Sequence, residues 1–564
     1  MYFESIGIPL SNPLISDQTT RTRETQLAME VHQRCYDRPT RALERLKSTH
    51  KMTVPERLDA ILDPGTPWFD LGIFVGDEET PLAGVYCVAG TICGLNVIVI
   101  ANDNAQNAGA WVPGSTEKIQ RAQDTARRLH IPVVWLIECP GLHLLTQEQT
   151  YGGSHGAGGI FEHQIRHTQA GLVQVAAVFG DCIAGGGYLP IFCDHVIMTE
   201  QATVRIGGTA LNHFAKAGSG KLGGPDVHVH ETGCADERVS DDKEACRRIR
   251  AYIGRLPSSA VSFYRIAAPL PPRFDASDLY AIVPSDTHKS FDVRELIARL
   301  VDGSLVCEID PTSDDRIYAC HALVQGLRVI LIANQTCRMG SVLTRESILK
   351  MIRIVRDARA EGLPIIWLQD VSGFDIGETA EREGLLRHGA HLLRALTQTD
   401  DDAPHLTLCL RKASGAGYYA MKGRPFAPAL IAGTVLTRLE VMAPHVLANT
   451  MYDAKMTRTA QRIETLEAEK QRLSAQAANY PQDVDNAASE LSTVVENLEI
   501  EQKRFQTLEA QKASLLAHQE SESDVCSAIR RGDLDACIRL CDLRAFVVYF
   551  VESAWQNLRM HQPR

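Results

Sequence analysis

The stretch GLNVIVIAND, residues 94–103, decides the fold, because a close copy of it, GLRVILIANQ, returns at residues 326–335. A second pair of stretches keeps the same register. PVVWLIECPG begins at Pro132 and PIIWLQDVSG at Pro364, so both pairs are separated by 232 residues (326 − 94 and 364 − 132). Two apolar runs that recur at one spacing are far rarer by chance than one. The sequence therefore predicts a single fold that occurs twice in the chain.

Each copy has the pattern of a β-α-β unit. A buried, β-branched run leads to a polar loop with glycine, an amphipathic helix follows, and a second buried run ends in Pro-Gly or Ser-Gly. Ser115 and Thr344 stand where the helices should begin, and both are residue types that cap a helix. Continuous apolar strands that alternate with such helices predict an α/β fold with largely parallel strands covered by helices.

The length of the chain and one proline-rich segment predict its domains. A chain of 564 residues exceeds one ordinary core, so we expect two large domains. Three prolines in IAAPLPPRFD, residues 266–275, break any helix there and mark the boundary. We predict an N-terminal helical extension and two domains, the second with a helical insertion. The limits are 1–48, 49–272 and 273–564, with the insertion at 454–520.

Composition excludes several classes of function. The chain has 58 basic and 69 acidic residues, a formal net charge of −11 and no basic stripe, so nucleic acid is not an expected partner. Its apolar runs have the length of strands and not of membrane spans, and the N-terminus has no secretion signal. The 15 cysteines include no CxxC pair, which predicts reduced thiols, a cytoplasmic protein and no bound metal.

The insertion has the seven-residue repeat of a coiled coil. Apolar residues keep the 3–4 spacing from Met456 to Tyr480 and again from Leu491 to Leu515. Pro481, Asp483 and Asp485 would form the turn between the two series. The sequence predicts an antiparallel coiled-coil hairpin, which is either an exposed helix pair without a partner or a docking arm for another subunit.

A glycine-rich turn follows an apolar strand in both halves. VFGDCIAGGGYLP occupies residues 178–190 and LRKASGAGYYAMKG residues 410–423, and aligning Gly187 with Gly417 gives a shift of 230. A strand that runs into small residues at a helix start points unpaired backbone N–H groups at one spot, which is the geometry of an oxyanion hole. Close packing of a helix on a strand is the alternative explanation.

Few side chains suggest chemistry of their own, since the chain has no GxSxG or HExxH motif. His228 and His230 would share one face of a strand, but no third ligand lies near, so a structural role is expected. Cys182 has no histidine nearby in the sequence to act as its base. Asp370 either orients the second turn or caps a helix.

Five segments, in order along the chain, carry a resemblance to a known family. They are ANDNAQNAGAWVPGSTEKI (101–119), CIAGGGYLPI (182–191), KLGGPDVHVHETGCADERVSDDKEACRRIRAYIGRLP (221–257), ASDLYAIVPSDTHKSFDVRELIARLVDGS (276–304) and LQDVSGFDIGETAE (368–381). Together they resemble the carboxyltransferase subunits of biotin-dependent acyl-CoA carboxylases and decarboxylases, which have a duplicated crotonase-like β-β-α superhelix. Within that family the sequence is most similar to the alpha subunit type of glutaconyl-CoA decarboxylase.

The resemblance implies a role for both glycine turns. The N–H groups of Gly186 and Gly187, with Gly185 as the alternative partner, would hold the enolate of an acyl-CoA thioester. Those of Ala416 and Gly417 would hold the ureido oxygen of biotin. A carboxyl group would move between a glutaconyl-CoA-like acyl-CoA and biotin, with the direction left open.

The resemblance also implies what surrounds the site. Two sets of glycines would contact the substrates: Gly152, Gly153, Gly158 and Gly159 in a flexible loop on the acyl-CoA side, and Gly415 and Gly373 on the biotin side. AMKGR, residues 420–424, lacks the second methionine of a biotin attachment motif. Lys422 is therefore expected to be an ordinary lysine on the surface or in a loop. Biotin is then expected on a separate carrier protein. Active sites would lie between subunits of a homo-oligomer. The hairpin could hold further carboxylase or decarboxylase subunits, in the cytoplasm or peripheral to a membrane complex.

Two other functions fit parts of the sequence. A biotin-independent crotonase-like hydratase, isomerase or thioesterase needs only one oxyanion hole, and a hydratase also needs a placed carboxylate pair. A non-catalytic assembly subunit would have degenerate glycine turns. Intact turns in both halves favour the carboxyltransferase.

Overall fold

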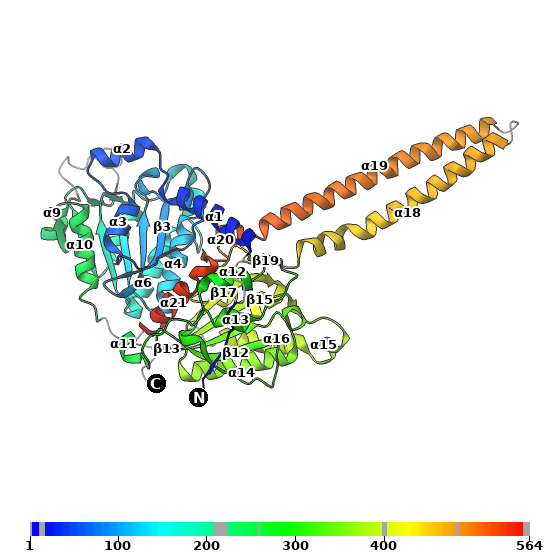
Figure 1. The fold of residues 1–564 in the computed structure, drawn as a ribbon. Coiled ribbons are helices and arrows are strands. Elements are labelled where there is room, and N and C mark those ends of the chain that lie inside the picture. The colour runs from blue at the N-terminus through cyan, green and yellow to red at the C-terminus, as the bar shows by residue number, and fades with distance from the viewer. Residues whose placement is uncertain are drawn as a thin grey trace. The chain divides into compact units, whose positions relative to one another are not determined.

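The computed structural model describes residues 3–10, 17–207, 223–257, 260–397, 403–479 and 484–556. They form two compact units (Figure 1). One comprises residues 1–438 and 525–564, and the other, residues 439–524, contains the predicted insertion. Within the described ranges, no helix combines the length and the apolar character needed to cross a bilayer.

The first sheet has the strand order β10-β8-β6-β5-β4-β3-β2. Its strands pair in parallel, except that β3 is antiparallel to both of its neighbours. The bounds are β2 (Phe69–Asp70), β3 (Val85–Ile92), β4 (Leu95–Asn102), β5 (Val133–Ile137), β6 (Gln174–Val178), β8 (His195–Thr199) and β10 (Glu237–Val239).

The second sheet repeats this plan in the order β1-β11-β12-β13-β15-β17-β18-β20. Its bounds are β1 (Glu4–Ser5), β11 (Leu305–Glu308), β12 (Ile317–Val324), β13 (Leu327–Asn334), β15 (Ile365–Val371), β17 (His405–Ser414), β18 (Leu430–Gly433) and β20 (Ala536–Cys537). Ile98 pairs with Val133 in the first sheet and Ile330 with Ile365 in the second, which is the predicted shift of 232. The predicted duplicated α/β fold is confirmed.

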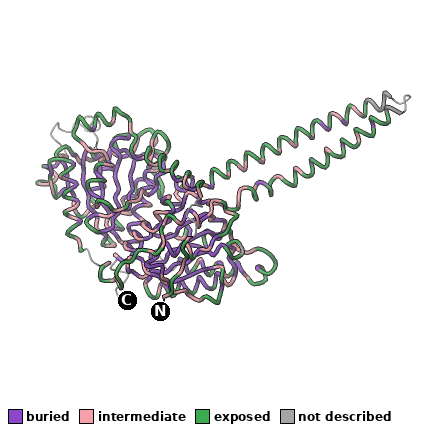
Figure 2. The backbone as a smooth tube through the Cα atoms, in the orientation of Figure 1, coloured by how far each residue is buried: buried purple, intermediate pink, exposed green. Residues whose placement is uncertain are grey.

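Burial of whole strands explains why their sequences are continuously apolar. Every residue of β4, β5 and β6 is buried, and Figure 2 shows both sheets as buried interiors.

In each half two helices pack against each other, α4 with α6 and α14 with α16. Their bounds are α4 (Ser115–Leu129), α6 (Ala157–Ala170), α14 (Arg345–Glu361) and α16 (Leu385–Thr397), and α10 (Asp242–Ile253) covers β6 and β8. The shorter helices are α3 (Val54–Ile61), α5 (Gln147–Thr150), α9 (Pro225–Val227), α11 (Ala260–Tyr264), α12 (Leu279–Ile282), α13 (Val293–Ile297), α15 (Glu378–Arg382) and α20 (Val525–Arg531).

One of the two predicted helix caps is correct. Thr344 caps α14, where its hydroxyl accepts from the N–H of Ser347. The prediction for Ser115 is wrong by one residue, because the cap position of α4 is Gly114, which has φ +87°. Ser115 is the first helical residue, and its hydroxyl donates to the carbonyl oxygen of Ala83 (2.7 Å).

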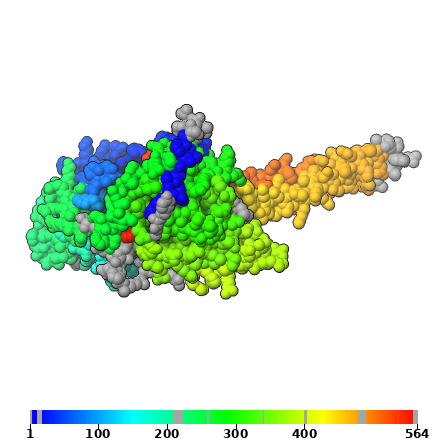
Figure 3. All heavy atoms as spheres, turned by 60° about the horizontal axis from the view of Figure 1, so that its bottom comes forward, coloured from blue at the N-terminus to red at the C-terminus, as the bar shows by residue number. Residues whose placement is uncertain are grey.

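The two ends of the chain join its two halves. The predicted N-terminal extension contains α1 (Gln18–Tyr36) and α2 (Thr40–Ser48), and β1 adds an antiparallel strand to the second sheet. Figure 3 shows dark-blue N-terminal residues across the surface of the second half, whereas α2 contacts the first half, where Arg45 donates to the carbonyl oxygen of Asn104 (2.5 Å). The C-terminal helix α21 (Leu543–Gln556) contacts both sheets: Asn96 on β4 donates to the carbonyl oxygen of Tyr549 (3.1 Å), and Trp555 donates to that of Arg328 on β13 (2.9 Å).

The second unit is the predicted helical hairpin, formed by α18 (Pro444–Asn479) and α19 (Val484–Glu522). Its small core consists of heptad residues from both helices: Leu466, Leu473, Val494 and Leu498, with Ile463 and Leu491 beside them. Pro481 and Asp483 of the predicted turn lie outside the described residues. Asp485 belongs to the first turn of α19 and not to the connection.

Replacing Leu473 by alanine should destabilise the hairpin by about 2 kcal/mol, since its side chain is 2% exposed. Hydrogen exchange of the backbone amides in 463–498 should quicken accordingly. Gln471→Ala, two residues away on the exposed face, is the control and should leave exchange unchanged. Equal effects of the two changes would contradict the assigned core.

Candidate active site

Both glycine turns follow a strand in the middle of a sheet and begin a short helix. β6 leads through β7 (Asp181–Ile183) to α7 (Gly185–Ile191), and β17 leads directly to α17 (Gly415–Ala420). Ala184 (φ +51°) and Gly415 (φ +53°) both have a positive φ and are 231 residues apart. The strands before them have the same spacing, since Val133 pairs with Gln174 and Ile365 with His405. The alignment at a shift of 230 is therefore wrong by one residue. The equivalent pairs are Gly185 with Ala416 and Gly186 with Gly417.

The first turn of each short helix offers two backbone donors. Among the described residues, the N–H groups of Gly185 and Gly186 have no hydrogen-bond acceptor, and neither do those of Ala416 and Gly417. Gly187 differs, because its N–H donates to the carbonyl oxygen of Ala184 (3.1 Å). The internal duplication thus favours Gly185 with Gly186, and not Gly186 with Gly187, as the counterpart of Ala416 with Gly417.

Close packing also requires a glycine at one position of each turn. A Cβ atom on Gly186 would lie 2.0 Å from the carbonyl oxygen of Cys139. A Cβ atom on Gly417 would lie 2.8 Å from Cγ2 of Val371 and 3.1 Å from Cα of Gly373, on the neighbouring strand β16 (Gly373–Phe374). The two explanations of the glycine turns therefore do not exclude each other. The same turns contain glycines required for close packing and N–H groups that can donate.

Aromatic side chains line the first turn, and sequence reasoning missed them. A Cβ atom on Gly185 would lie 3.3 Å from the Trp111 ring and 3.7 Å from Phe161. The Phe161 ring in turn lies 5.8 Å from that of Tyr188, which is half exposed. The position equivalent to Trp111 in the second half is Leu343, since His143 donates to the carbonyl oxygen of Trp111 and Asp375 to that of Leu343. The repeat therefore gave no signal for this aromatic side chain.

The predicted flexible glycine loop is partly a helix. Gly152 and Gly153 are exposed in a turn, as expected, but Gly158 and Gly159 belong to the first turn of α6. A Cβ atom on Gly159 would lie 2.7 Å from the side-chain amide of Gln120 on α4. The packing of α6 on α4 therefore outweighs the low helix propensity of glycine there.

A buried ionic network stands behind the first turn. The guanidinium of Arg57 donates to Oδ2 of Asp242 (2.8 Å) and lies 3.3 Å from Oε2 of Glu138, which also pairs with Lys51 (2.5 Å). Burial raises the pKa of Glu138, but the charges of Arg57 and Lys51 outweigh it and hold that pKa below its ordinary value. Glu138 is thus kept ionised directly after β5.

Asp370 occupies the equivalent position in the second half. It lies in β15 and is not a helix cap, so that alternative is wrong. Its Oδ2 accepts from Nε of Arg411 (2.8 Å), both side chains are buried, and its Oδ1 accepts from the N–H of Lys412 (3.1 Å). Asp370 therefore fixes the end of β17, three residues before α17 begins.

Three other sequence candidates have structural roles. Cys182 is fully buried, and burial raises the pKa of its thiol well above the usual value, so it is no nucleophile. His228 and His230 lie in a single helical turn and not on one face of a strand; Lys221 and Leu222, which begin their segment, lie outside the described residues. No cluster of metal-ligating side chains occurs in the described part of the chain.

Lys422 lies in a turn, which agrees with one of the two predicted alternatives, but it is not a surface lysine. Its side chain is fully buried, and its ammonium donates to the carbonyl oxygen of Leu396 (2.9 Å). Because solvent does not reach it, Lys422 cannot carry biotin in this fold.

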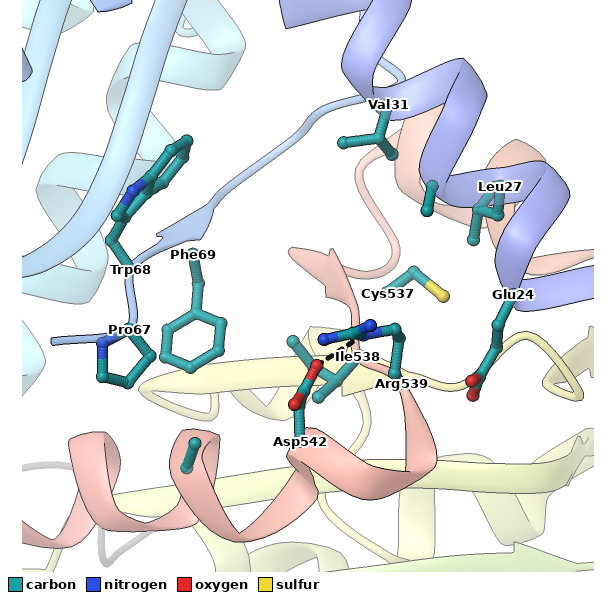
Figure 4. Close-up of a pocket in the computed structure, with 12 residues that line it drawn as sticks. Glu24, Leu27, Val31, Pro67, Trp68, Phe69, Cys537, Ile538, Arg539 and Asp542 are labelled. Atoms are coloured by element: carbon teal, nitrogen blue, oxygen red, sulfur yellow. Dashed lines mark hydrogen bonds and ion pairs between the residues drawn. The ribbon is translucent and has the colours of Figure 1, made fainter. Parts of the chain in front are cut away.

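A cavity of about 370 Å³ lies elsewhere, between α1, the segment before β2 and the segment after β20 (Figure 4). Trp68, Phe69 and Ile538 form apolar walls, and Arg539 pairs with Asp542 (2.6 Å). None of the lining residues belongs to either glycine turn, so this cavity is separate from the candidate site.

Comparison with known proteins agrees with this geometry. The chain matches the carboxyl transferase domain family over residues 47–564. It is 27% identical to the glutaconyl-CoA decarboxylase subunit alpha of Acidaminococcus fermentans, over 99% of this chain and 94% of that protein. It is 32% identical to the biotin-dependent 3-methylcrotonyl-coenzyme A carboxylase beta1 subunit of Mycobacterium tuberculosis, over 73% and 78%. The geranyl-CoA carboxylase beta subunit of P. aeruginosa has the same fold, with a TM-score of 0.77 at 24% identity over 98% and 96%.

The chain thus has a duplicated crotonase-like fold with a glycine turn in each half. The chain belongs to the carboxyl transferase domain family and is a subunit of a biotin-dependent acyl-CoA carboxyltransferase. The resemblance read from the sequence is thereby confirmed. Its relatives include carboxylases and a decarboxylase, so the family alone does not set the direction of transfer.

Proposed function

We propose that this subunit transfers a carboxyl group between a glutaconyl-CoA-like, unsaturated acyl-CoA and biotin. The N–H groups of Gly185 and Gly186 hold the oxygen of the thioester enolate, and those of Ala416 and Gly417 hold the ureido oxygen of biotin. The observation that carries the proposal is the matched pair of turns, each with two N–H groups that lack an acceptor within the described residues. Three relatives named for unsaturated acyl-CoAs (glutaconyl, 3-methylcrotonyl and geranyl) support the substrate class.

Backbone donors suit this chemistry because negative charge develops on a carbonyl oxygen on both sides of the transfer. A fixed N–H donor aimed at such an oxygen is worth about 10²–10³ in rate in other enzymes. Bound biotin supplies the nitrogen that carries the carboxyl group. This chain supplies the polarising donors, the aromatic wall at Trp111 and Phe161 on the thioester side, and Gly373 and Gly415 beside the biotin side.

Biotin comes on a separate carrier protein, since the burial of Lys422 removes the lysine in the AMKGR sequence as an attachment point. On the acyl-CoA side, exposed Gly152, Gly153 and Gly158 remain our assigned contacts, while Gly159 serves the packing of α6. The protein acts in the cytoplasm, or at the periphery of a membrane complex whose further subunits the hairpin holds.

A second copy of the chain completes the active site. Exposed apolar side chains stand at equivalent places beside both turns: Leu144 and Ile376 are 74% and 91% exposed, and Tyr188 and Tyr419 are 51% and 42% exposed. Such patches are rarely left in water. Their equivalence fits an arrangement in which the first half of one subunit faces the second half of another.

The proposal is tested by carboxyl transfer to free biotin from four thioesters: glutaconyl-, 3-methylglutaconyl-, malonyl- and methylmalonyl-CoA. Biotin-dependent carbon dioxide release is expected at least about tenfold faster from the two unsaturated substrates, a difference of about 1.4 kcal/mol in the barrier. Release from none of the four would overturn the proposal. Biotin-independent hydration of crotonyl-CoA would instead favour a hydratase.

A further inference from the structure

The two glycine turns differ in charge at one equivalent position. Ala184 and Gly415, which both have a positive φ, set a shift of 231, and three residues before them stand Asp181 and Lys412. The first half therefore has a carboxylate where the second half has an ammonium group. The duplication makes this difference visible, because the two residues occupy equivalent positions in the repeat.

The ammonium of Lys412 is anchored next to the strand on which the second turn packs. Its Nζ is 2.8 Å from Oγ of Ser372, whose hydroxyl donates to the carbonyl oxygen of Gly340 (2.7 Å). Ser372 precedes Gly373, the residue whose Cα approaches Gly417. The ammonium is thus held at the edge of the strand on which the first turn of α17 packs.

The backbone of Lys412 is fixed as well. Its N–H donates to the carboxylate of Asp370 (3.1 Å), and the adjacent Arg411 forms a buried ion pair with the same carboxylate. The side chain itself is half-buried, so it remains within reach of a ligand. Lys412 therefore combines a fixed backbone with a partly exposed ammonium that is anchored at Ser372.

Asp181 has different surroundings in the first half. Its Oδ1 accepts from the guanidinium of Arg205 (3.1 Å) on β9 (Thr203–Arg205) and from the hydroxyl of Thr203. The position equivalent to Ser372 is Pro140, which has no hydroxyl to anchor a cation. The first half thus lacks the elements that place the ammonium in the second.

We propose that Lys412 binds the carboxylate group that is transferred, while that group is attached to biotin. The inference rests on the proposed function and adds a binding residue to it. The bond from the carboxyl carbon to the biotin nitrogen breaks as its bond to the acyl carbon forms, and one proton moves from that carbon to the nitrogen. The carboxylate carries one negative charge both before and after the transfer, so a fixed ammonium serves transfer in either direction.

A matched pair of ligands tests this binding without turnover. Both are methyl esters of biotin, one with a carboxymethyl group on the ureido nitrogen and the other with the neutral, nearly isosteric carbamoylmethyl group. The full chain should bind the anionic ligand about 10- to 100-fold more tightly, as expected for one hydrogen bond between charged groups. Titration calorimetry measures both dissociation constants.

Variants of Lys412 decide the outcome. Lys412→Gln should bind the two ligands equally, and Lys412→Arg should keep most of the preference, since it keeps the charge. Lys243→Gln, an exposed lysine on α10, is the control and should behave as wild type. An unchanged preference in Lys412→Gln, or no preference in the wild type, overturns the inference and leaves the biotin site standing. Failure of the wild type to bind either ligand overturns the proposed biotin site and the inference together.

A kinetic measurement separates the two halves of the site. Lys412→Gln should lower kcat/KM for the biotin substrate about 10- to 100-fold, while the dissociation constant of the acyl-CoA, measured without biotin, stays as in wild type. A merely structural role of Lys412 would change both quantities.

Discussion

Replacement of Ala416 by proline is expected to slow carboxyl transfer about 10²–10³-fold, the usual loss when one oxyanion donor is removed. Ala416 is the second residue of α17 and is exposed, so the proline ring meets solvent. Proline is tolerated in the first turn of a helix, because no N–H there has an intrahelical acceptor. The change therefore removes one hydrogen-bond donor and little else. Steady-state transfer to free biotin measures the effect.

The matched control is Ala416→Ser, which adds a polar atom at the same exposed position and keeps the N–H group. It should transfer at close to the wild-type rate. Binding of the acyl-CoA, measured without biotin, should stay normal in both variants, since it depends on the first half. Near-full transfer by Ala416→Pro would show that this N–H group holds no reacting oxygen.

Replacement of Arg57 by methionine is expected to lower the free energy of unfolding by about 3–5 kcal/mol at pH 7, because it leaves buried carboxylates without their cation. The Arg57 side chain is fully buried, and its guanidinium lies 3.9 Å from the centre of the Phe179 ring. Asp242 loses its ionic partner and Glu138 keeps only Lys51. Urea unfolding measures the loss. Arg166→Met, at an exposed pair on α6, is the control and should cost less than about 1 kcal/mol.

The same variant should show a distinct pH dependence. In the wild type the pKa of Glu138 lies below its unfolded value of 4.5, so this group stabilises the fold above that pH and the contribution is lost as pH falls further. Without Arg57, burial acts against a weaker attraction and raises the pKa of Glu138. The difference between wild type and variant should therefore shrink as the pH falls from 7 to 4. A difference independent of pH would contradict this account of Glu138.

The sequence was sufficient for the architecture because the strands of this fold are buried on both faces. Their apolar runs tolerate few alternatives, so the register of 232 residues survived in both halves and predicted equivalent strands. The heptad pattern of the hairpin was equally readable, since Leu466 and Leu498 have no other core to join. Periodic burial leaves a clear trace in a sequence.

The backbone conformation of the glycine turns could not be predicted from the sequence. Any of three consecutive glycines could take a positive φ, yet the residue that does so is Ala184. The carbonyl oxygen of Cys139 lies so close to Gly186 that only glycine fits there. This contact joins segments that are distant in the sequence. Lys422 is buried for a similar reason, because its ammonium meets the carbonyl of Leu396. Contacts between distant segments override local preference at these places.

The arrangement of the second sheet bears on how the protein is made. All strands of the first sheet come from residues 69–239, whereas the second sheet has residues 4–5 at one edge and residues 536–537 at the other. A ribosome therefore releases everything the first sheet needs long before it has produced the last strand of the second. Translation of residues 439–524 lies within that interval and, at about 5–20 residues per second, adds roughly 4–17 s. During this delay the nascent chain has an unfinished sheet edge at β18, so the length of the hairpin sets how long that edge is open to wrong partners.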